Sequence, residues 1–142
     1  MHTAARAALA ATATAALALG GVAAAHAVPA IPVNNGQETT GATGGARGFF
    51  SYDIEGDQFC YTLEVEGLSA PTTAAHIHIG DRKVAGPVVV PINVPNETSF
   101  EVSDCVTAST TVLQAIEADP KAYYVNVHTP TYPGGEVRGQ LK

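Results

Sequence analysis

The sequence predicts an all-β domain, namely an antiparallel, Greek-key-like β-sandwich or barrel with one short helix. About seven or eight short segments alternate apolar and polar residues with a period of two, which is the pattern of half-buried strands. Residues that favour turns, mainly Gly, Pro, Asn and Asp, separate these segments at the close spacing typical of antiparallel folds.

The segment ahead of this domain, residues 1–27, has the features of a cleavable secretory signal peptide. Arg6 precedes an alanine-rich apolar run, and Ala25-His26-Ala27 matches the small-residue pattern of a cleavage site. An uncleaved membrane anchor is the alternative, because the run is about long enough to span a bilayer. Its threonines and glycines favour cleavage. We therefore expect a secreted, extracellular protein without a membrane span after cleavage.

The charge balance narrows the range of partners. The chain has 7 Lys and Arg against 13 Asp and Glu, a net charge of −6, and loss of Arg6 with the leader makes the mature chain more acidic. Such a surface does not attract phosphate backbones or anionic lipids. We expect no nucleic-acid partner, and an extracellular protein or a small ligand of unidentified kind remains open.

The first elements of the domain follow a loosely ordered N-terminal segment. Residues 28–45 are rich in Pro, Gly, Asn and Thr and leave room for one short strand, so the β domain proper is expected over residues 46–142. Two strands then form a hairpin around Glu55-Gly56-Asp57. Their apolar positions are Ala46, Gly48, Phe50, Tyr52 and Ile54 before the turn, and Phe59, Tyr61, Leu63 and Val65 after it.

The remaining elements are short. Strands are predicted over residues 74–79, 87–94, 99–102, 123–128 and 136–141. The prolines of 87–94 favour an edge strand or a bulge. A helix is expected to begin at Ser109 or Thr110 and to end before Asp119-Pro120.

The two cysteines, Cys60 and Cys105, are predicted to form a disulfide, because an even pair in an exported protein is usually bonded. The alternation turns Cys60 away from the apolar face, so the segment carrying Cys105 is expected to cover it. A closed loop of roughly 45 residues would stabilise the fold by about 3–4 kcal/mol. Two separate buried thiols are the alternative, and a catalytic cysteine is disfavoured outside the cell.

Three histidines remain after cleavage: His76, His78 and His128. His76 and His78 are two residues apart on one predicted strand and therefore share a face. His128 lies on the polar face of a later strand, so the three imidazoles converge if both strands lie in one sheet. Such a trio, with water as a fourth ligand, suits copper or zinc.

Three polar residues are candidates for orienting these rings: Asn126, Asp81 and Glu136. The alternative interpretation places the histidines on a solvated face, where they bond only to their neighbours. No catalytic residue is assigned, because the sequence has no nucleophile elbow and the glycines of 41–48 lack the context of a phosphate loop. An enzymatic function is therefore the less favoured hypothesis.

Several segments, taken in order, carry a resemblance to a known family. They are Gly67-Leu68, Ala75-His76-Ile77-His78-Ile79-Gly80, Gly86-Pro87-Val88-Val89, Tyr124-Val125-Asn126-Val127-His128-Thr129 and Pro133-Gly134-Gly135-Glu136-Val137-Arg138-Gly139-Gln140-Leu141. Together they resemble the CHRD domain of chordin and of many secreted microbial proteins. The resemblance implies an extracellular β-sandwich-like module and no particular activity. The growth-factor antagonism of chordin is not carried over, because the chain lacks the cysteine-rich modules found beside the domain there.

The segment around His76 and His78 is also similar to the copper-binding strand of copper/zinc superoxide dismutase. Three histidines cannot furnish the two-metal site of that enzyme, which needs about six. The sequence therefore leaves two hypotheses. The leading one is a non-enzymatic extracellular binding or structural module. The other is a copper- or zinc-binding protein that uses the three histidines, with superoxide-dismutase-like redox activity as an extension.

Overall fold

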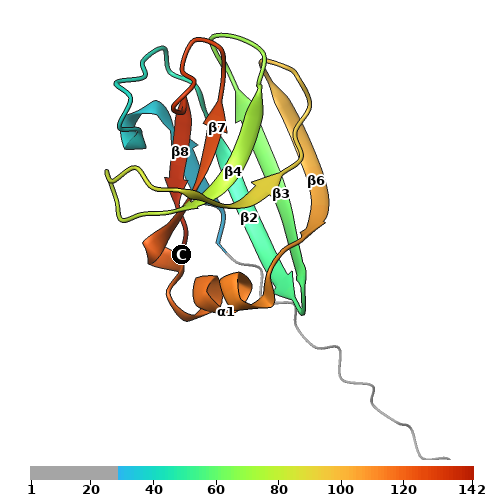
Figure 1. The fold of residues 1–142 in the computed structure, drawn as a ribbon. Helices are drawn as coiled ribbons and strands as arrows, with labels where there is room; N and C mark the ends of the chain where they lie inside the picture. Colours follow the sequence, from blue (N-terminus) through green and yellow to red (C-terminus); the bar gives the residue numbers. More distant parts are fainter. Residues whose placement is uncertain (1–28) are drawn as a thin grey trace, which may run out of the picture.

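The computed structural model describes residues 29–142, and the predicted signal peptide lies outside this range. Eight antiparallel strands form one sheet in the order β5-β4-β7-β8-β1-β2-β3-β6. The sheet curls into a nearly closed barrel or sandwich with one short α-helix at its end (Figure 1), which confirms the predicted fold class. Within residues 29–142, no helix is long and apolar enough to cross a membrane.

The elements lie close to their predicted positions. The strands are β1 (Ile31–Asn34), β2 (Arg47–Glu55), β3 (Gln58–Glu66), β4 (Ala74–Ile79), β5 (Val88–Ile92), β6 (Phe100–Thr107), β7 (Tyr123–His128) and β8 (Val137–Gln140). The helix α1 covers Thr110–Ala118, and two short 3₁₀ helices cover η1 (Asn35–Gln37) and η2 (Pro120–Ala122). Compared with the prediction, β5 is shorter and β6 extends further towards the helix.

The core lies between the inward faces of the strands. The β2–β3 hairpin closes at Gly56, whose φ of 63° fits a tight turn that glycine adopts without strain. Alternate residues of both arms, such as Phe50, Phe59 and Leu63, are fully buried. Leu113 and Ile116 of α1 are also buried, and the helix closes one end of the sandwich (Figure 1).

The N-terminal segment contributes an interior strand. The sequence indicated loose order over residues 28–45, but β1 pairs with β2 on one side and with β8 on the other. Ile31 and Val33 are each 1% exposed. Gly139 of β8 allows this close approach, because a Cβ there would stand 2.7 Å from Val33 Cγ1. The segment is therefore part of the barrel rather than an appendage, because its two apolar residues fill an inward row.

The predicted disulfide is present, with an S–S distance of 2.08 Å between Cys60 and Cys105. The two residues lie directly opposite each other on β3 and β6. Cys105 is exposed, so the segment that carries it lies beside Cys60 and does not cover it. The reason is that β6 joins the sheet as the strand after β3 and does not pack on its outer surface.

Candidate metal centre

The outward side chains of β4, β7 and β8 form one continuous row across neighbouring strands. His76 lies opposite Asn126, which lies opposite Arg138 in the next strand. We call these outward residues the covered face: His76, His78, Tyr124, Asn126, His128 and Arg138. All of them are buried except His76, which is partly exposed. The predicted polar face thus exists, and it lies beneath other parts of the chain.

The loop of residues 80–87 is one of the segments that cover it. Arg138 donates to the carbonyl oxygens of Val84 at 2.9 Å and of Asp81 at 2.8 Å. Lys83, in a left-handed conformation with φ 66°, donates from Nζ to the carbonyls of Gly36 and Glu38. A strained residue of this kind persists where several contacts fix it. The loop is therefore held both to β8 and to the N-terminal segment.

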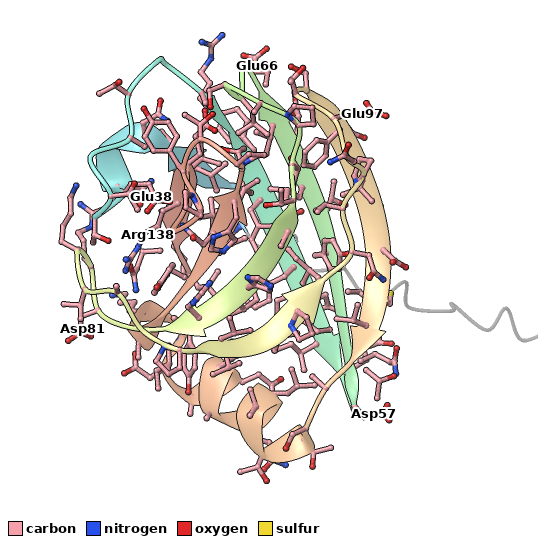
Figure 2. All side chains as sticks on the ribbon, turned by 45° about the horizontal axis from the view of Figure 1, so that its top comes forward. Glu38, Asp57, Glu66, Asp81, Glu97 and Arg138 are labelled. Carbon is pink, nitrogen blue, oxygen red and sulfur yellow. A yellow bond between two sulfur atoms is a disulfide. The ribbon has the colours of Figure 1, made fainter. Side chains whose placement is uncertain are left out.

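Two further segments complete the cover. Asn126 donates to the carboxylate of Glu38, which follows η1 in the N-terminal segment. Figure 2 shows Glu38 and Arg138 close together on this side of the molecule. Gly135 lies against Asn126 and Glu38, and a Cβ there would stand 2.3 Å from Asn126 Oδ1. Glycine at this position lets the loop of residues 129–136 approach the sheet.

The three histidines converge under this cover. One ligand nitrogen from each of His76, His78 and His128 lies within 4.8 Å of the other two. The closest observed pair is His76 Nδ1 and His128 Nε2, which are 3.1 Å apart. The ring centroids are 4.9–5.6 Å apart. The convergence follows from the register, because β4 and β7 are neighbours and their outward residues alternate in step.

Backbone carbonyls orient two of the rings. Nδ1 of His78 lies 2.9 Å from the Gly86 oxygen, and Nδ1 of His128 lies 3.0 Å from the Pro133 oxygen. Because a carbonyl only accepts, each Nδ1 carries a proton and each neutral ring has its lone pair on Nε2. Nε2 of His78 is buried and has no hydrogen-bond partner among the described residues. A buried acceptor without a bond is uncommon in folded proteins, so this nitrogen is a candidate ligand atom.

Burial keeps these rings neutral. Loss of solvation lowers the pKa of His128 to about 4, despite the opposing bond to Pro133. Loss of solvation also lowers the pKa of His76. Loss of solvation also lowers the pKa of His78 and outweighs the opposing bond to Gly86, and the charges of His76 and Arg138 lower that pKa further by smaller amounts. A neutral imidazole is the form that binds metals, so no proton needs to leave at neutral pH.

The nitrogen positions fit one transition-metal ion after a small adjustment. Two ligands at about 2.0–2.1 Å from an ion are roughly 2.9–3.4 Å apart at right or tetrahedral angles, and about 4.1 Å apart on opposite sides. The 3.1 Å pair already has the first spacing, but it is a hydrogen bond in which His76 Nδ1 donates to the His128 Nε2 lone pair. His76 must therefore shift its proton from Nδ1 to Nε2 before Nδ1 can bind an ion. A spread of 4.8 Å requires the widest pair to close by somewhat less than about 1 Å to reach the second.

The residues expected to orient the rings make their bonds elsewhere. Asn126 bonds to Glu38 and to the Val137 carbonyl. The carboxylate of Glu136 accepts from the Ser69 amide and hydroxyl and from the Thr129 hydroxyl. Asp81 is exposed and lies at the rim of the molecule in Figure 2. These residues therefore build the cover, whereas Gly86 and Pro133 orient the rings.

A comparison with known families agrees with this architecture. The family model of the CHRD domain matches residues 22–141. The chain belongs to the CHRD domain family. No curated protein and no solved structure matches this CHRD chain. CHRD is an extracellular-type domain, and the disulfide fits that setting.

Sequence reasoning missed two features of this CHRD site. Tyr124 stacks on His78 with the ring planes 6° apart and the centroids 4.9 Å apart. The guanidinium carbon of Arg138 lies 3.4 Å from the centre of the same Tyr124 ring. The alternation of polar and apolar residues predicts that these residues share a face, but it does not predict that they stack. Gly86 stands out in the sequence only as part of the family motif.

Proposed function

We propose that this CHRD domain is an exported module that binds a single copper or zinc ion through His76, His78 and His128. The observation that carries the proposal is the buried Nε2 of His78, which has no partner among the described residues and belongs to a group of three convergent imidazoles. Burying an acceptor without a bond costs free energy. A bound ion would remove that cost.

Three properties of the site support a metal over a purely structural role. The rings are neutral, since burial lowers their pKa values. Two rings have their tautomer fixed by carbonyls, as in many protein metal sites. His76 remains partly exposed, which gives an ion access to the group. A histidine trio with one accessible side is typical of sites that keep an open coordination position.

Export is the second part of the proposal. The leader pattern of residues 1–27 and the disulfide both favour an oxidising compartment. Expression of the full chain with its leader, followed by N-terminal sequencing of the protein in the medium, tests it. We expect a mature chain that begins at Val28. Retention of an intact leader in the membrane fraction would contradict export.

Metal titration of the purified protein tests the binding claim. We expect one equivalent of Cu(II) or Zn(II) to bind, and to raise the midpoint of thermal unfolding. The variant His76→Ala/His78→Ala should lose at least about a hundredfold in affinity, because second-shell changes alone already cost 10–100-fold. A matched control is Glu64→Ala/Glu101→Ala, which removes two exposed carboxylates directly opposite each other on β3 and β6. Equal affinity in the histidine variant and the wild type would overturn the proposal.

A further inference from the structure

We propose that the three-histidine site prefers the cuprous ion, Cu(I), over divalent copper and zinc, and that Arg138 contributes to this preference. The inference rests on the proposed metal site and names the ion and the charge state that the site favours. It follows from the charge of the donors, from the nearest fixed cation and from the spacing of the nitrogens.

The donors bring no negative charge to the ion. The group consists of three neutral imidazoles. The carboxylates that sequence and fold place nearby are engaged elsewhere: Glu38 with Asn126, and Glu136 with Ser69 and Thr129. Asp81 is exposed, and its backbone carbonyl accepts from Arg138. A divalent ion would therefore retain its full double charge in a largely buried place, which is less favourable than a single charge.

The guanidinium of Arg138 is a fixed positive charge, and the Tyr124 ring separates it from His78. Arg138 of β8 stacks on Tyr124 of β7, and Tyr124 stacks on His78 of β4. The guanidinium carbon is therefore no more than about 8 Å from the centre of the His78 ring, the two stacking distances taken together. Arg138 is 2% exposed and cannot swing away, since its donors are bonded to the carbonyls of Val84 and Asp81. The positive charge of Arg138 repels a divalent ion at the site more strongly than a monovalent one.

Glu38 offsets part of this cation. Its carboxylate lies beyond Asn126, and loss of solvation raises its pKa although Asn126, Arg138 and Lys83 lower it. Burial thus makes the ionised form of Glu38 less favourable, whereas the guanidinium of Arg138 stays charged. At the separation found between Arg138 and His78, one extra charge on the ion changes affinity by about tenfold.

The spacing of the nitrogens also favours copper. A zinc ion prefers tetrahedral ligands, which brings every pair of nitrogens to about 3.4 Å. Here one pair is 3.1 Å apart while the group spreads to 4.8 Å. Cu(I) accepts two or three imidazole ligands and imposes no tetrahedral angle, so it tolerates this uneven spacing. Zinc would require the larger rearrangement of the covered face.

The test is a chelator competition on the purified full-length mature protein, with Cu(I), Cu(II) and Zn(II) measured separately under the same buffer. We expect a dissociation constant for Cu(I) at least about tenfold lower than those for Cu(II) and Zn(II). Tighter binding of Cu(II) or Zn(II) than of Cu(I) would overturn this inference and leave the metal-binding function intact. Failure of all three ions to bind would overturn the proposed function itself.

Two substitutions isolate the role of Arg138. Arg138→Met removes the charge and keeps much of the volume, and should reduce the preference for Cu(I) over Cu(II) by about tenfold. Arg138→Lys keeps the charge and should retain most of the preference. An unchanged preference in Arg138→Met would exclude the charge effect. If Arg138→Met does not fold, the ranking of the three ions on the wild type still decides the main claim.

Discussion

The two outer faces of the same sheet differ in their surroundings, although the strands that form them have the same alternation. On β3 and β6 the outward residues are largely exposed, and Glu64 lies directly opposite Glu101 in water. On β4, β7 and β8 the outward residues are buried, with Asn126 and Arg138 each 2% exposed. We call the first of these the open face. Alternation along a strand therefore fixes the direction of a side chain but not whether water reaches it.

Different forces stabilise the two faces. The open face carries the disulfide and a hydrogen bond of 2.8 Å between the hydroxyls of Thr62 and Ser103. The covered face depends on buried polar groups that must be paired. Its cover is specified by bonds from Arg138, Lys83 and Glu136 to loops that are distant in sequence.

The largest expected effect is on the open face. Replacing both cysteines, Cys60→Ser/Cys105→Ser, releases a loop of 45 residues in the unfolded chain. The free energy of unfolding should fall by about 3–4 kcal/mol. Urea denaturation measures this, with metal affinity as the internal control, because the bond lies away from the histidines. A loss of less than about 1 kcal/mol would show that the disulfide does little for the fold.

Two glutamates, one on each face, should differ in how much their removal lowers the free energy of unfolding. Glu136→Ala leaves the Ser69 amide and hydroxyl and the Thr129 hydroxyl without their acceptor, and should cost roughly 3 kcal/mol in the free energy of unfolding. Glu64→Ala on the open face should change that energy by no more than about 0.5 kcal/mol. Chemical denaturation of both variants gives the comparison. Similar losses in the two variants would mean that the faces do not differ as described.

Acid should weaken the covered face. The pKa of His128 is about 4 in the folded protein, below the ordinary value of 6.5. Between these values the unfolded chain binds a proton that the folded protein does not. Stability is therefore constant above pH 6.5 and falls as the pH drops towards 4. We expect a loss on the order of 2 kcal/mol by pH 5, measured by urea denaturation of the metal-free protein. His128→Gln should flatten this slope, and an unchanged slope would assign it to other groups.

A smaller effect is expected from the loop that orients His78. In Gly86→Ala the new Cβ would stand 1.7 Å from the Ile79 carbonyl oxygen, so the backbone at Gly86 must shift, and we expect this to disturb the bond between its carbonyl and His78. Metal affinity should fall by about tenfold. Gly36→Ala is the control, because its Cβ meets only the Asn34 side chain at 3.2 Å. Equal affinities in the two variants would argue against a role for the Gly86 carbonyl.

Much of the fold is predictable from local pattern. The bounds of β4 and β7 match the expected 74–79 and 123–128, because each is a clean alternation bounded by turn residues. The helix is predictable because apolar residues recur at helical spacing and Asp119-Pro120 ends it. The place of β1 was not predictable, since a four-residue strand in a segment rich in Pro and Asn has too short a pattern.

The site was predictable only in part. The face shared by His76 and His78 follows from their spacing, and their approach to His128 follows once β4 and β7 are neighbours. The cover was not predictable, because it depends on loops that meet the sheet through single contacts such as Lys83 with Glu38. The carbonyl partners of the rings were missed for the same reason, since any residue supplies a carbonyl and the sequence does not mark it.

X-ray absorption of the protein loaded with one equivalent of copper shows whether the covered face holds one ion on three imidazoles. We predict three imidazole nitrogens at about 2.0 Å from the metal in the wild type. In the His76→Ala/His78→Ala variant the imidazole signal should fall to at most the one ring of His128. A coordination shell of carboxylate or water oxygen, unchanged by the two substitutions, would rule out the three-histidine site.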